Sequence, residues 1–164
     1  MDVRPATVRD LPAITAIAVD AWREAYSGLI GLNAVERYLE TSYSARGLRH
    51  RFEDHPIFVA GMDGMVCAFA DVFVEDGRVV VSELCTLPRH QRMGCATGLI
   101  GAARAHGRGR PVTADVVLGN TVAERFYERR GFVPGETISI DFFGATIVER
   151  RWWDQAVRTE ATAS

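Results

Sequence analysis

The chain has 164 residues, of which 48% are hydrophobic and 24% are charged, and its formal net charge is −2. This length predicts one domain around a single core. The composition excludes a disordered chain, a collagen-like repeat and a disulfide-dense mini-domain. All 19 basic residues are arginines. The lack of lysine excludes a Walker-type phosphate lysine, a Schiff-base lysine and a lysine general base.

The charge and the cysteines indicate the expected partners and compartment. A net charge near zero gives no general attraction for nucleic acid or an anionic membrane, so neither is expected as a partner. Cys67, Cys85 and Cys95 form no C-x-x-C motif, and the N-terminus has no apolar signal segment, which predicts a reduced, cytoplasmic protein. The histidines form no H-E-x-x-H motif and no Cys/His ligand pair, so no metal site is expected.

The N-terminal third is predicted to contain one strand and then helices. A short strand is expected over 3–7, and Thr7 with Asp10 forms a capping-box pattern in front of a helix. Apolar residues recur at helical spacing over 11–25. A second helical region extends over 33–52, with a break near 42–44.

The middle of the chain changes to the pattern of strands. Strands are predicted over 56–61, 65–75 and 79–87, separated by Asp-Gly pairs at 63–64 and 76–77. Asp-Gly between apolar runs is typical of tight hairpin turns, so these strands form an antiparallel meander.

The C-terminal half alternates helices and strands. A loop over 88–93 leads into a helix that Gly107 is expected to cap, and a strand follows over 111–117. A last helix begins at Asn120 or Thr121, and two strands over 133–142 and 146–153 form a hairpin. The segment 79–117 has the length of a right-handed parallel crossover, which predicts a mixed sheet. Residues 155–164 are expected to fray.

The segment 83–98, ELCTLPRHQRMGCATG, combines the features of an anion-binding loop. A polar loop with Arg89 and Arg92 leads from a strand into a helix. A helix N-terminus offers unpaired N–H groups and the positive end of the helix dipole. Gly94 and Ala96 leave room for a phosphate to approach the backbone. A phosphate or pyrophosphate site is one interpretation, and an ordinary polar loop before a capped helix is the other.

Two motifs in the expected order resemble those of the GCN5-related N-acetyltransferase (GNAT) family. Residues 91–96, QRMGCA, resemble its Q/R-x-x-G-x-G/A signature, with Pro88 six residues before Gly94. Asn120 followed by FYERRGF over 126–132 resembles its second motif, N-x-x-A-x-x-F-Y-x-x-x-G-F. The opening VRPATVRDLPAI is also similar to the first strand and helix of that family, so the resemblance covers nearly the whole chain.

The resemblance implies a fold and an activity. The fold would be a single α/β (α+β) domain over 1–154, with a mixed, mostly antiparallel seven-stranded sheet flanked by about four helices. The activity would be the transfer of an acetyl group from the co-substrate acetyl-CoA to a primary amine by direct attack. A function of a different class is a catalytically silent acyl-CoA-binding sensor or partner module.

The resemblance also assigns residues to acetyl-CoA. Leu84, Cys85 and Thr86 would present backbone groups to the pantetheine arm and the acetyl carbonyl, although Thr86 stands where the family more often has an apolar β-branched residue. Asn120 would contact the pantetheine arm. The pyrophosphate would be held by Gln91, Arg92, Met93, Gly94, Cys95, Ala96 and Thr97.

Two residues are candidates for the chemistry. An ammonium group must lose a proton before its nitrogen can attack, and Glu83 is the best-placed base, acting through water. The alternative is a strand glutamate that is exposed or ion-paired, and Asp115 and Glu149 are weaker candidates for the base. Tyr127 would lie near the thioester sulfur and hydrogen-bond to the developing thiolate. Its alternative role is that of a core aromatic residue.

The first helical region carries the residues that bear on the acceptor. The segment 21–30, AWREAYSGLI, resembles the spermidine/spermine N-acetyltransferase subgroup, which favours a small amine or polyamine, while a peptide acceptor stays open. Aromatic residues in or near the first helices are either core residues or cation–π partners of a cationic amine; they are Trp22, Tyr26, Tyr38 and Tyr43. Alternation at Trp152 and Trp153 predicts that one of them is buried and the other is available to a homodimer contact.

Overall fold

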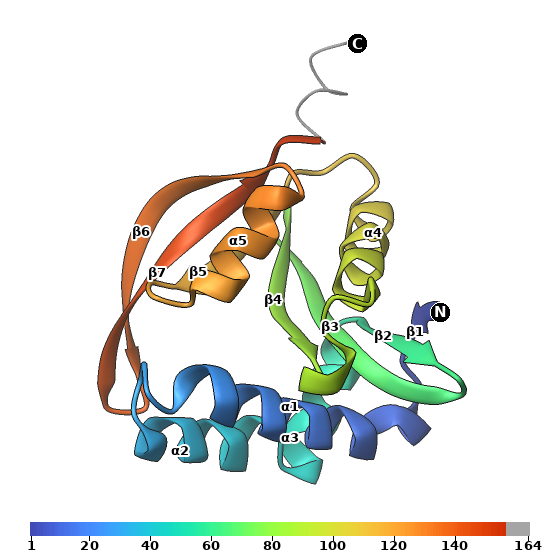
Figure 1. Ribbon diagram of the computed structural model, residues 1–164, viewed down its shortest axis with the longest axis horizontal. Helices are drawn as coiled ribbons and strands as arrows, with labels where there is room; N and C mark the ends of the chain where they lie inside the picture. Colours follow the sequence, from blue (N-terminus) through green and yellow to red (C-terminus); the bar gives the residue numbers. More distant parts are fainter. Residues whose placement is uncertain (157–164) are drawn as a thin grey trace.

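The computed structural model describes residues 1–156, and in that part of the chain it has a seven-stranded mixed sheet and five α-helices (Figure 1). The elements in chain order are β1 (Asp2–Pro5), α1 (Leu11–Tyr26), α2 (Leu32–Ser42), α3 (Ala45–Asp54), β2 (Ile57–Met62), β3 (Met65–Glu75), β4 (Arg78–Thr86), α4 (Cys95–Gly107), β5 (Val112–Val117), α5 (Thr121–Arg129), β6 (Phe132–Phe142) and β7 (Ala145–Asp154). The predicted fold class is therefore confirmed. The predicted tail 155–164 lies, beyond residue 156, outside the described residues.

The helical region predicted over 33–52 is two helices, which accounts for the fifth. The chain leaves α2 at Tyr43, and the Ser44 hydroxyl then caps α3 by accepting a hydrogen bond from the Gly47 N–H at 3.0 Å. The cap predicted for α4 at Gly107 is wrong. Gly107 belongs to the helix, and Arg108 is the C-cap with a left-handed φ of 50°. A Cβ at Gly107 would lie 2.7 Å from Val79, so glycine here allows α4 to approach β4.

The strands are ordered β1-β2-β3-β4-β5-β7-β6. Within the described residues only β4 and β5 run parallel, joined through α4, as the crossover prediction requires. The first Asp-Gly turn has φ angles of 52° at Asp63 and 77° at Gly64. The second has 50° at Asp76 and 74° at Gly77. Two successive positive φ angles are what a tight hairpin needs, so the predicted meander is confirmed.

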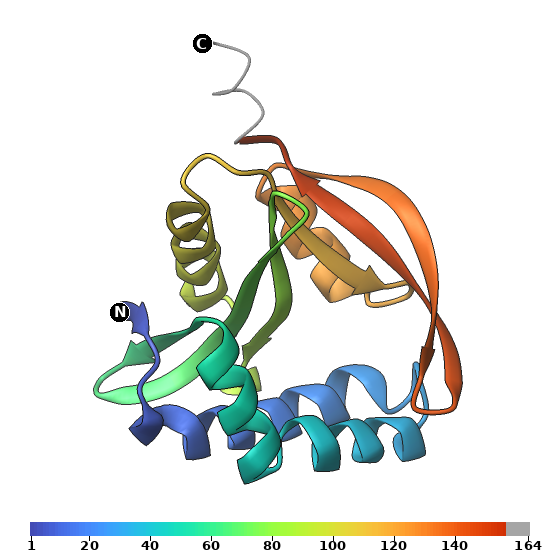
Figure 2. The ribbon, with the colours of Figure 1, turned by 180° about the vertical axis from the view of Figure 1, so that it is seen from behind.

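Helices cover both faces of the β3 part of the sheet. Six consecutive residues of β3, 67–72, are buried. Since successive side chains of a strand point to opposite faces, both faces of β3 are covered. Helices α1 and α4 both pack against β3, whereas α5 packs against β6. Figures 1 and 2 show the tip of the β6–β7 hairpin beside the connection from α1 to α2.

The strands β4 and β5 pair over only three residues each, Val79–Val81 with Val112–Ala114. In the ladder between β3 and β4, residues 71 and 72 pair with residues 83 and 81, so Ser82 is an extra residue that forms a β-bulge. A bulge bends its strand and interrupts the pairing. Beyond Val81 the two parallel strands therefore separate, which the apolar pattern of 79–87 does not reveal.

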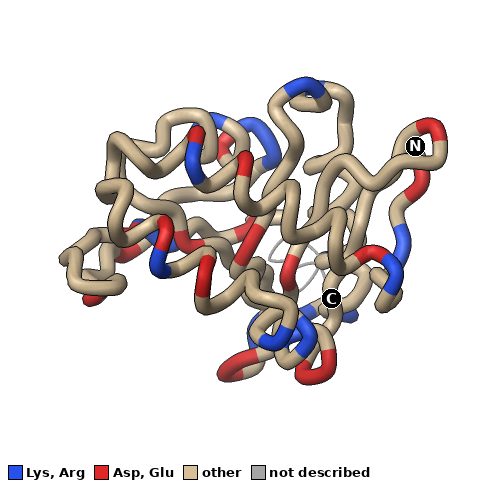
Figure 3. Tube along the Cα trace, turned by 90° about the horizontal axis from the view of Figure 1, so that it is seen from below, with Lys and Arg blue, Asp and Glu red and all other residues tan. Residues whose placement is uncertain are grey.

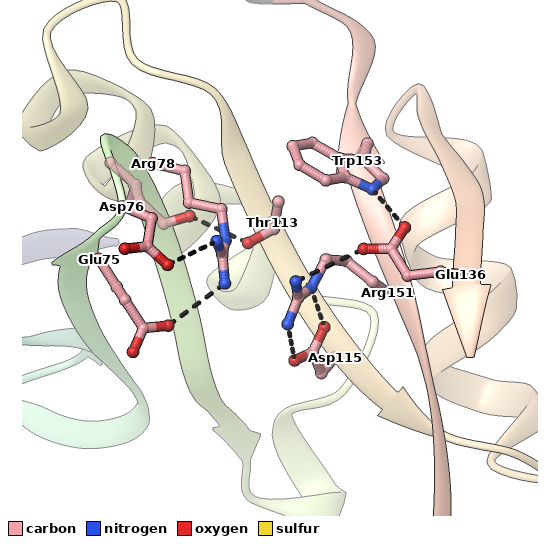
Figure 4. Close-up of polar contacts among 9 residues, drawn as sticks. Glu75, Asp76, Arg78, Thr113, Asp115, Glu136, Arg151 and Trp153 are labelled. Carbon is pink, nitrogen blue, oxygen red and sulfur yellow. Dashed lines mark hydrogen bonds and ion pairs between the residues drawn. The ribbon is translucent and has the colours of Figure 1, made fainter. Parts of the chain in front are cut away.

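Ion pairs connect β5, β6 and β7 (Figure 4). Arg151 on β7 forms two hydrogen bonds with Asp115 on β5, at 2.9 and 3.0 Å, and a third with Glu136 on β6 at 3.4 Å. Figure 3 shows acidic and basic residues interspersed along the chain on the side that it views. Among residues 1–156, no helix is long and apolar enough to cross a bilayer.

The tryptophan alternation predicted on the last strand is confirmed. Trp152 is buried and Trp153 is partly exposed, with its indole N–H bonded to Glu136 at 3.3 Å. The homodimer contact stays a prediction.

Candidate active site

The site is built on the part of β4 that no longer pairs with β5. Leu84, Cys85 and Thr86 follow the Ser82 bulge and pair with β3, but no strand of the described residues pairs with them on the other side. Since N–H and C=O groups point along the sheet to both sides of a strand, part of this backbone faces the space between β4 and β5. The three residues predicted to bind pantetheine therefore offer the backbone edge that an extended ligand requires.

Glu83 lies at the start of this segment, and both oxygens of its partly buried carboxylate accept hydrogen bonds. Trp22 Nε1 on α1 donates to Oε2 at 3.1 Å, and the Tyr38 hydroxyl on α2 donates to Oε1. Burial raises the pKa of Glu83 to about 7, although the hydrogen bonds and the nearby Arg51 act in the opposite direction. A carboxyl group with this pKa is present in both forms at neutral pH, as a general base should be.

The two donors to Glu83 belong to an aromatic cluster drawn from three parts of the chain. The Trp22 ring lies 4.4 Å from that of Tyr26 and 4.3 Å from that of Tyr38, between ring centroids. Phe142, at the tip of the β6–β7 hairpin, stacks on Trp22 at 5.7 Å and contacts Tyr38 at 5.1 Å. Tyr43 packs edge-on against Tyr38. These contacts favour the core interpretation for the aromatic residues of the first helices.

A buried ionic group lies close to this cluster. The Asp71 carboxylate is buried in β3 and contacts Arg51 Nε of α3 at 3.1 Å and the imidazole of His55. The Arg51 guanidinium lies over the Tyr43 ring, 4.5 Å from its centroid. Through this position Arg51 places a positive charge near Glu83 and lowers the pKa of that carboxyl group.

The predicted pyrophosphate loop has the geometry of an anion site at the start of α4. Arg92 and Gly94 have left-handed φ angles of 64° and 87°, and Gly94 is the N-cap without a side chain that could occupy the first amides. The first N–H groups of a helix have no acceptor within the helix. A Cβ at Gly94 would meet nothing within 4 Å, so the space beside Gly94 is open. Gln91, Arg92, Met93 and Thr97 are exposed around it, and Ala96 is partly exposed.

The side chain of Cys95 points away from this loop. Its Sγ lies 3.4 Å from Cys67 Sγ, and both cysteines are buried free thiols. Cys95 can therefore reach a phosphate only with its backbone N–H. Burial raises the pKa of the Cys85 thiol well above its ordinary value, so this thiol stays protonated, which disfavours it as a nucleophile.

Arg130 is a cation at this loop that the sequence motifs do not single out. Its Nε and Nη2 atoms donate to Thr97 Oγ1 at 2.9 and 2.6 Å, and its guanidinium lies 4.2 Å from the centroid of the Phe126 ring. A guanidinium has five N–H donors, so three remain for a ligand at the start of α4. Arg130 occupies a variable position of the second motif, and only its place immediately before Gly131 could have indicated it.

Tyr127 of α5 is the predicted partner of the thioester sulfur. Tyr127 is buried, and its hydroxyl forms no hydrogen bond within residues 1–156. Burial, followed by the nearby Tyr26, Cys85 and Glu83, raises the pKa of Tyr127, so it remains a phenol at neutral pH. The Tyr127 ring packs edge-on against Phe126 and Phe132, at 5.2 and 5.0 Å between centroids.

Asn120 has two partners in the protein. Its Oδ1 accepts from the Ala123 N–H at 3.2 Å as the cap of α5, and its Nδ2 donates to the Tyr26 hydroxyl at 3.0 Å. Asn120 thereby connects α5 with α1 across the end of the site. Its contact with pantetheine stays a prediction.

The two weaker candidates for the base differ from Glu83. Asp115 is occupied by its double hydrogen bond to Arg151. Glu149 on β7 has its pKa raised by burial and by Asp115, and it lines a cavity of about 190 Å³ together with Ser82. In residues 1–156 no group of three or more His, Cys, Asp and Glu side chains is arranged to hold a metal ion.

Comparison with known proteins identifies the family. The profile of the Acetyltransferase (GNAT) family matches residues 14–132. The fold is similar to PaiA N-acetyltransferase from Thermoplasma acidophilum, solved with coenzyme A, with a TM-score of 0.78 and 18% identity over 91% of this chain and 96% of that one. A GCN5-related N-acetyltransferase from Rhodopseudomonas palustris gives a TM-score of 0.79 and 18% identity over 93% and 94% of the two chains.

A third similar structure is the ribosomal-protein-S18-alanine N-acetyltransferase from Escherichia coli, with a TM-score of 0.70 and 18% identity over 93% of this chain and 92% of that one. A search of curated protein sequences finds no significant match. Both predicted motifs fall within the matched residues, one at the start of α4 and the other along α5. The chain therefore belongs to the GNAT family and is an acetyl-CoA-dependent N-acetyltransferase.

Proposed function

We propose that this protein transfers the acetyl group of acetyl-CoA directly to a primary amine, with Glu83 as the general base. The observation that carries this proposal is the Glu83 carboxylate, whose pKa of about 7 suits proton transfer at neutral pH. Glu83 lies two residues after Val81, the last residue of β4 that pairs with β5, and directly before the backbone edge of Leu84–Thr86. A base and an acyl-binding edge are thus consecutive in one strand.

The residues around α4 fit the phosphate end of acetyl-CoA. The amides of Cys95, Ala96 and Thr97 begin the helix behind a left-handed Gly94, and Arg130 adds a cation beside Thr97. Backbone N–H groups, the helix dipole and one guanidinium together provide for a pyrophosphate without any lysine. The free backbone of Leu84–Thr86 fits the amide groups of a pantetheine arm.

Acetyl-CoA supplies the acetyl group as a thioester, and the side chains handle the protons. Glu83 accepts a proton from the acceptor ammonium, directly or through water, and leaves a neutral amine. The amine nitrogen then forms a bond to the acetyl carbon as the carbon–sulfur bond breaks. The sulfur leaves as a thiolate, towards which the Tyr127 hydroxyl directs a hydrogen bond, and it takes up the second proton, which the nitrogen loses as the amide forms. The products are the amide, CoA as the thiol and one proton released to solvent.

Replacing Tyr127 by phenylalanine is expected to lower kcat about 10- to 100-fold with little change in the KM for acetyl-CoA. The loss of one hydrogen bond to a group that becomes charged costs roughly 1.5–3 kcal/mol, and this bond exists only as the sulfur leaves. Steady-state kinetics with a saturating amine measure the effect. An unchanged kcat would remove Tyr127 from the mechanism.

Replacing Arg130 by glutamine is expected to raise the KM for acetyl-CoA about tenfold, equivalent to roughly 1.4 kcal/mol, and to leave kcat within about twofold. The reason is the loss of the guanidinium that is hydrogen-bonded to Thr97 beside the α4 amides. Arg129→Gln is the matched control, because Arg129 is the exposed preceding residue in α5. Equal effects of the two substitutions would show that general charge, and not this position, is responsible.

The acceptor class is tested by CoA release from acetyl-CoA over a panel of amines. The panel contains monoamines, polyamines and a peptide with an N-terminal alanine, since the similar E. coli protein is named for a ribosomal-protein alanine. A small amine or polyamine is the expected preferred acceptor. Binding of acetyl-CoA without turnover on any member would favour the silent acyl-CoA-binding module instead.

A further inference from the structure

Two helices contribute one hydrogen-bond donor each to the Glu83 carboxylate. Trp22 Nε1 of α1 bonds to Oε2, and the Tyr38 hydroxyl of α2 bonds to Oε1. Donors directed at both oxygens fix the plane of the carboxylate, and they favour its ionised form over its protonated form. We call Trp22 and Tyr38 the donor pair.

The donor pair is itself held in place from the far end of the sheet. Phe142 of the β6–β7 hairpin stacks on the Trp22 ring and also contacts the Tyr38 ring. Trp22 is only 7% exposed, so its indole has little freedom to turn away. The carboxylate on β4 is thus held by α1 and α2, and the β6–β7 hairpin packs on the two rings that hold it.

The remaining groups that face Glu83 are mostly neutral at neutral pH. Arg51 and Asp71 are the charged ones, and they form an ion pair with each other at 3.1 Å. Burial raises the pKa of the neutral groups in this neighbourhood, which are Tyr26, Tyr43, Cys85 and Tyr127. Among residues 1–156, the donor pair makes the N–H and O–H hydrogen bonds to this carboxylate. The Cys85 thiol is a weaker donor, with its Sγ 3.9 Å from Oε2.

We propose that Trp22 and Tyr38 are positioning residues of the acetyl-transfer reaction, which hold the Glu83 carboxylate in one orientation and set the pH range in which it accepts a proton. The inference rests on the proposed role of Glu83 as the base. A purely structural role would affect folding and the amount of active enzyme. A positioning role also changes the pH at which the enzyme becomes active.

The test compares the pH profiles of kcat/KM for wild type, Tyr38→Phe, Trp22→Phe and Tyr43→Phe. Tyr38→Phe removes only the hydroxyl that stabilises the carboxylate, so Glu83 should hold its proton to higher pH. The acidic limb of the profile is expected to move upward by about one pH unit, with the KM for acetyl-CoA unchanged. Trp22→Phe should move the acidic limb in the same direction, because it removes the hydrogen bond to the other carboxylate oxygen, Oε2.

Tyr43→Phe is the matched control, because Tyr43 is a buried tyrosine of the same cluster that contacts the Tyr38 ring but is not among the hydrogen-bond donors to Glu83. Its acidic limb should coincide with that of the wild type. The inference is overturned if the Tyr38→Phe and wild-type profiles coincide, or if Tyr43→Phe moves the limb as far as Tyr38→Phe does.

A titration without substrates separates this inference from the proposed function. Protein labelled with carbon-13 at the glutamate carboxyl groups reports the protonation of Glu83 by NMR, with the Glu83 signal identified by its loss in Glu83→Gln. A midpoint that does not move in Tyr38→Phe or Trp22→Phe overturns the role of the donor pair. A midpoint that moves while the kinetic limb stays fixed overturns the role of Glu83 as the base.

Discussion

Replacing Glu83 by glutamine is expected to lower kcat/KM for the acceptor amine about 100-fold at neutral pH, the lower end of what a general base contributes. Glutamine has nearly the same shape and keeps an oxygen that can accept the Trp22 N–H. Its amide nitrogen can donate to the Tyr38 oxygen, so the packing around α1 and α2 should survive. The loss would then report the missing base and not a collapsed site.

The pH dependence gives this prediction a second readout. For the wild type, kcat/KM should rise with pH through about 7, because only the ionised Glu83 accepts a proton and its pKa is about 7. In Glu83→Gln this limb should disappear. Glu149→Gln is the control, since Glu149 is another carboxyl group whose pKa is raised by burial. If the limb disappears in Glu149→Gln and persists in Glu83→Gln, the base is Glu149.

Stability should depend on pH in a related way. The pKa of Glu83 is raised in the folded state from 4.5 to about 7, so the folded protein binds a proton more tightly than the unfolded chain. The contribution of Glu83 to stability is complete below pH 4.5 and is lost as the pH rises through 7. The unfolding free energy of Glu83→Gln relative to wild type should therefore increase from pH 4.5 to pH 8, as urea titrations would measure.

The elements of the site could be predicted from local signals, whereas its electrostatics could not. The start of α4 is visible in the sequence because a left-handed Gly94, small residues and an arginine-bearing loop are local requirements of one turn of chain. The Asp-Gly hairpins are local for the same reason. The Ser82 bulge is not, because VVVSELCT reads as an uninterrupted strand and the extra residue becomes evident only against the register of β3.

The hydrogen bonds to Glu83 join residues that are far apart in the sequence. Trp22 is 61 residues from Glu83 in the sequence and Tyr38 is 45 residues away, so their hydrogen bonds follow from how α1 and α2 pack on the sheet. The aromatic spacing of these helices predicts a buried face but does not indicate which ring carries a donor to a carboxylate. Arg130 was missed for a related reason, since its partner Thr97 lies 33 residues away.

Replacing Arg104 by methionine is expected to destabilise the protein by about 3–5 kcal/mol, because it leaves a buried carboxylate without its cation. The Asp154 side chain at the end of β7 is completely buried, and Arg104 of α4 bonds to both of its oxygens, at 2.6 and 3.1 Å. Arg104 also donates to the backbone oxygen of Arg130 at 3.2 Å. One side chain thus joins α4, the last strand and the turn that carries Arg130.

The unfolding midpoint in urea, followed by circular dichroism, measures this loss. Arg125→Met is the control, because Arg125 is an exposed helical arginine, and it should change stability by less than about 0.5 kcal/mol. The double substitution Arg104→Met with Asp154→Leu should recover much of the loss, since it removes the unpaired charge as well as the cation. A loss below about 1 kcal/mol in Arg104→Met would mean that water reaches Asp154, and the double substitution would then bring no recovery.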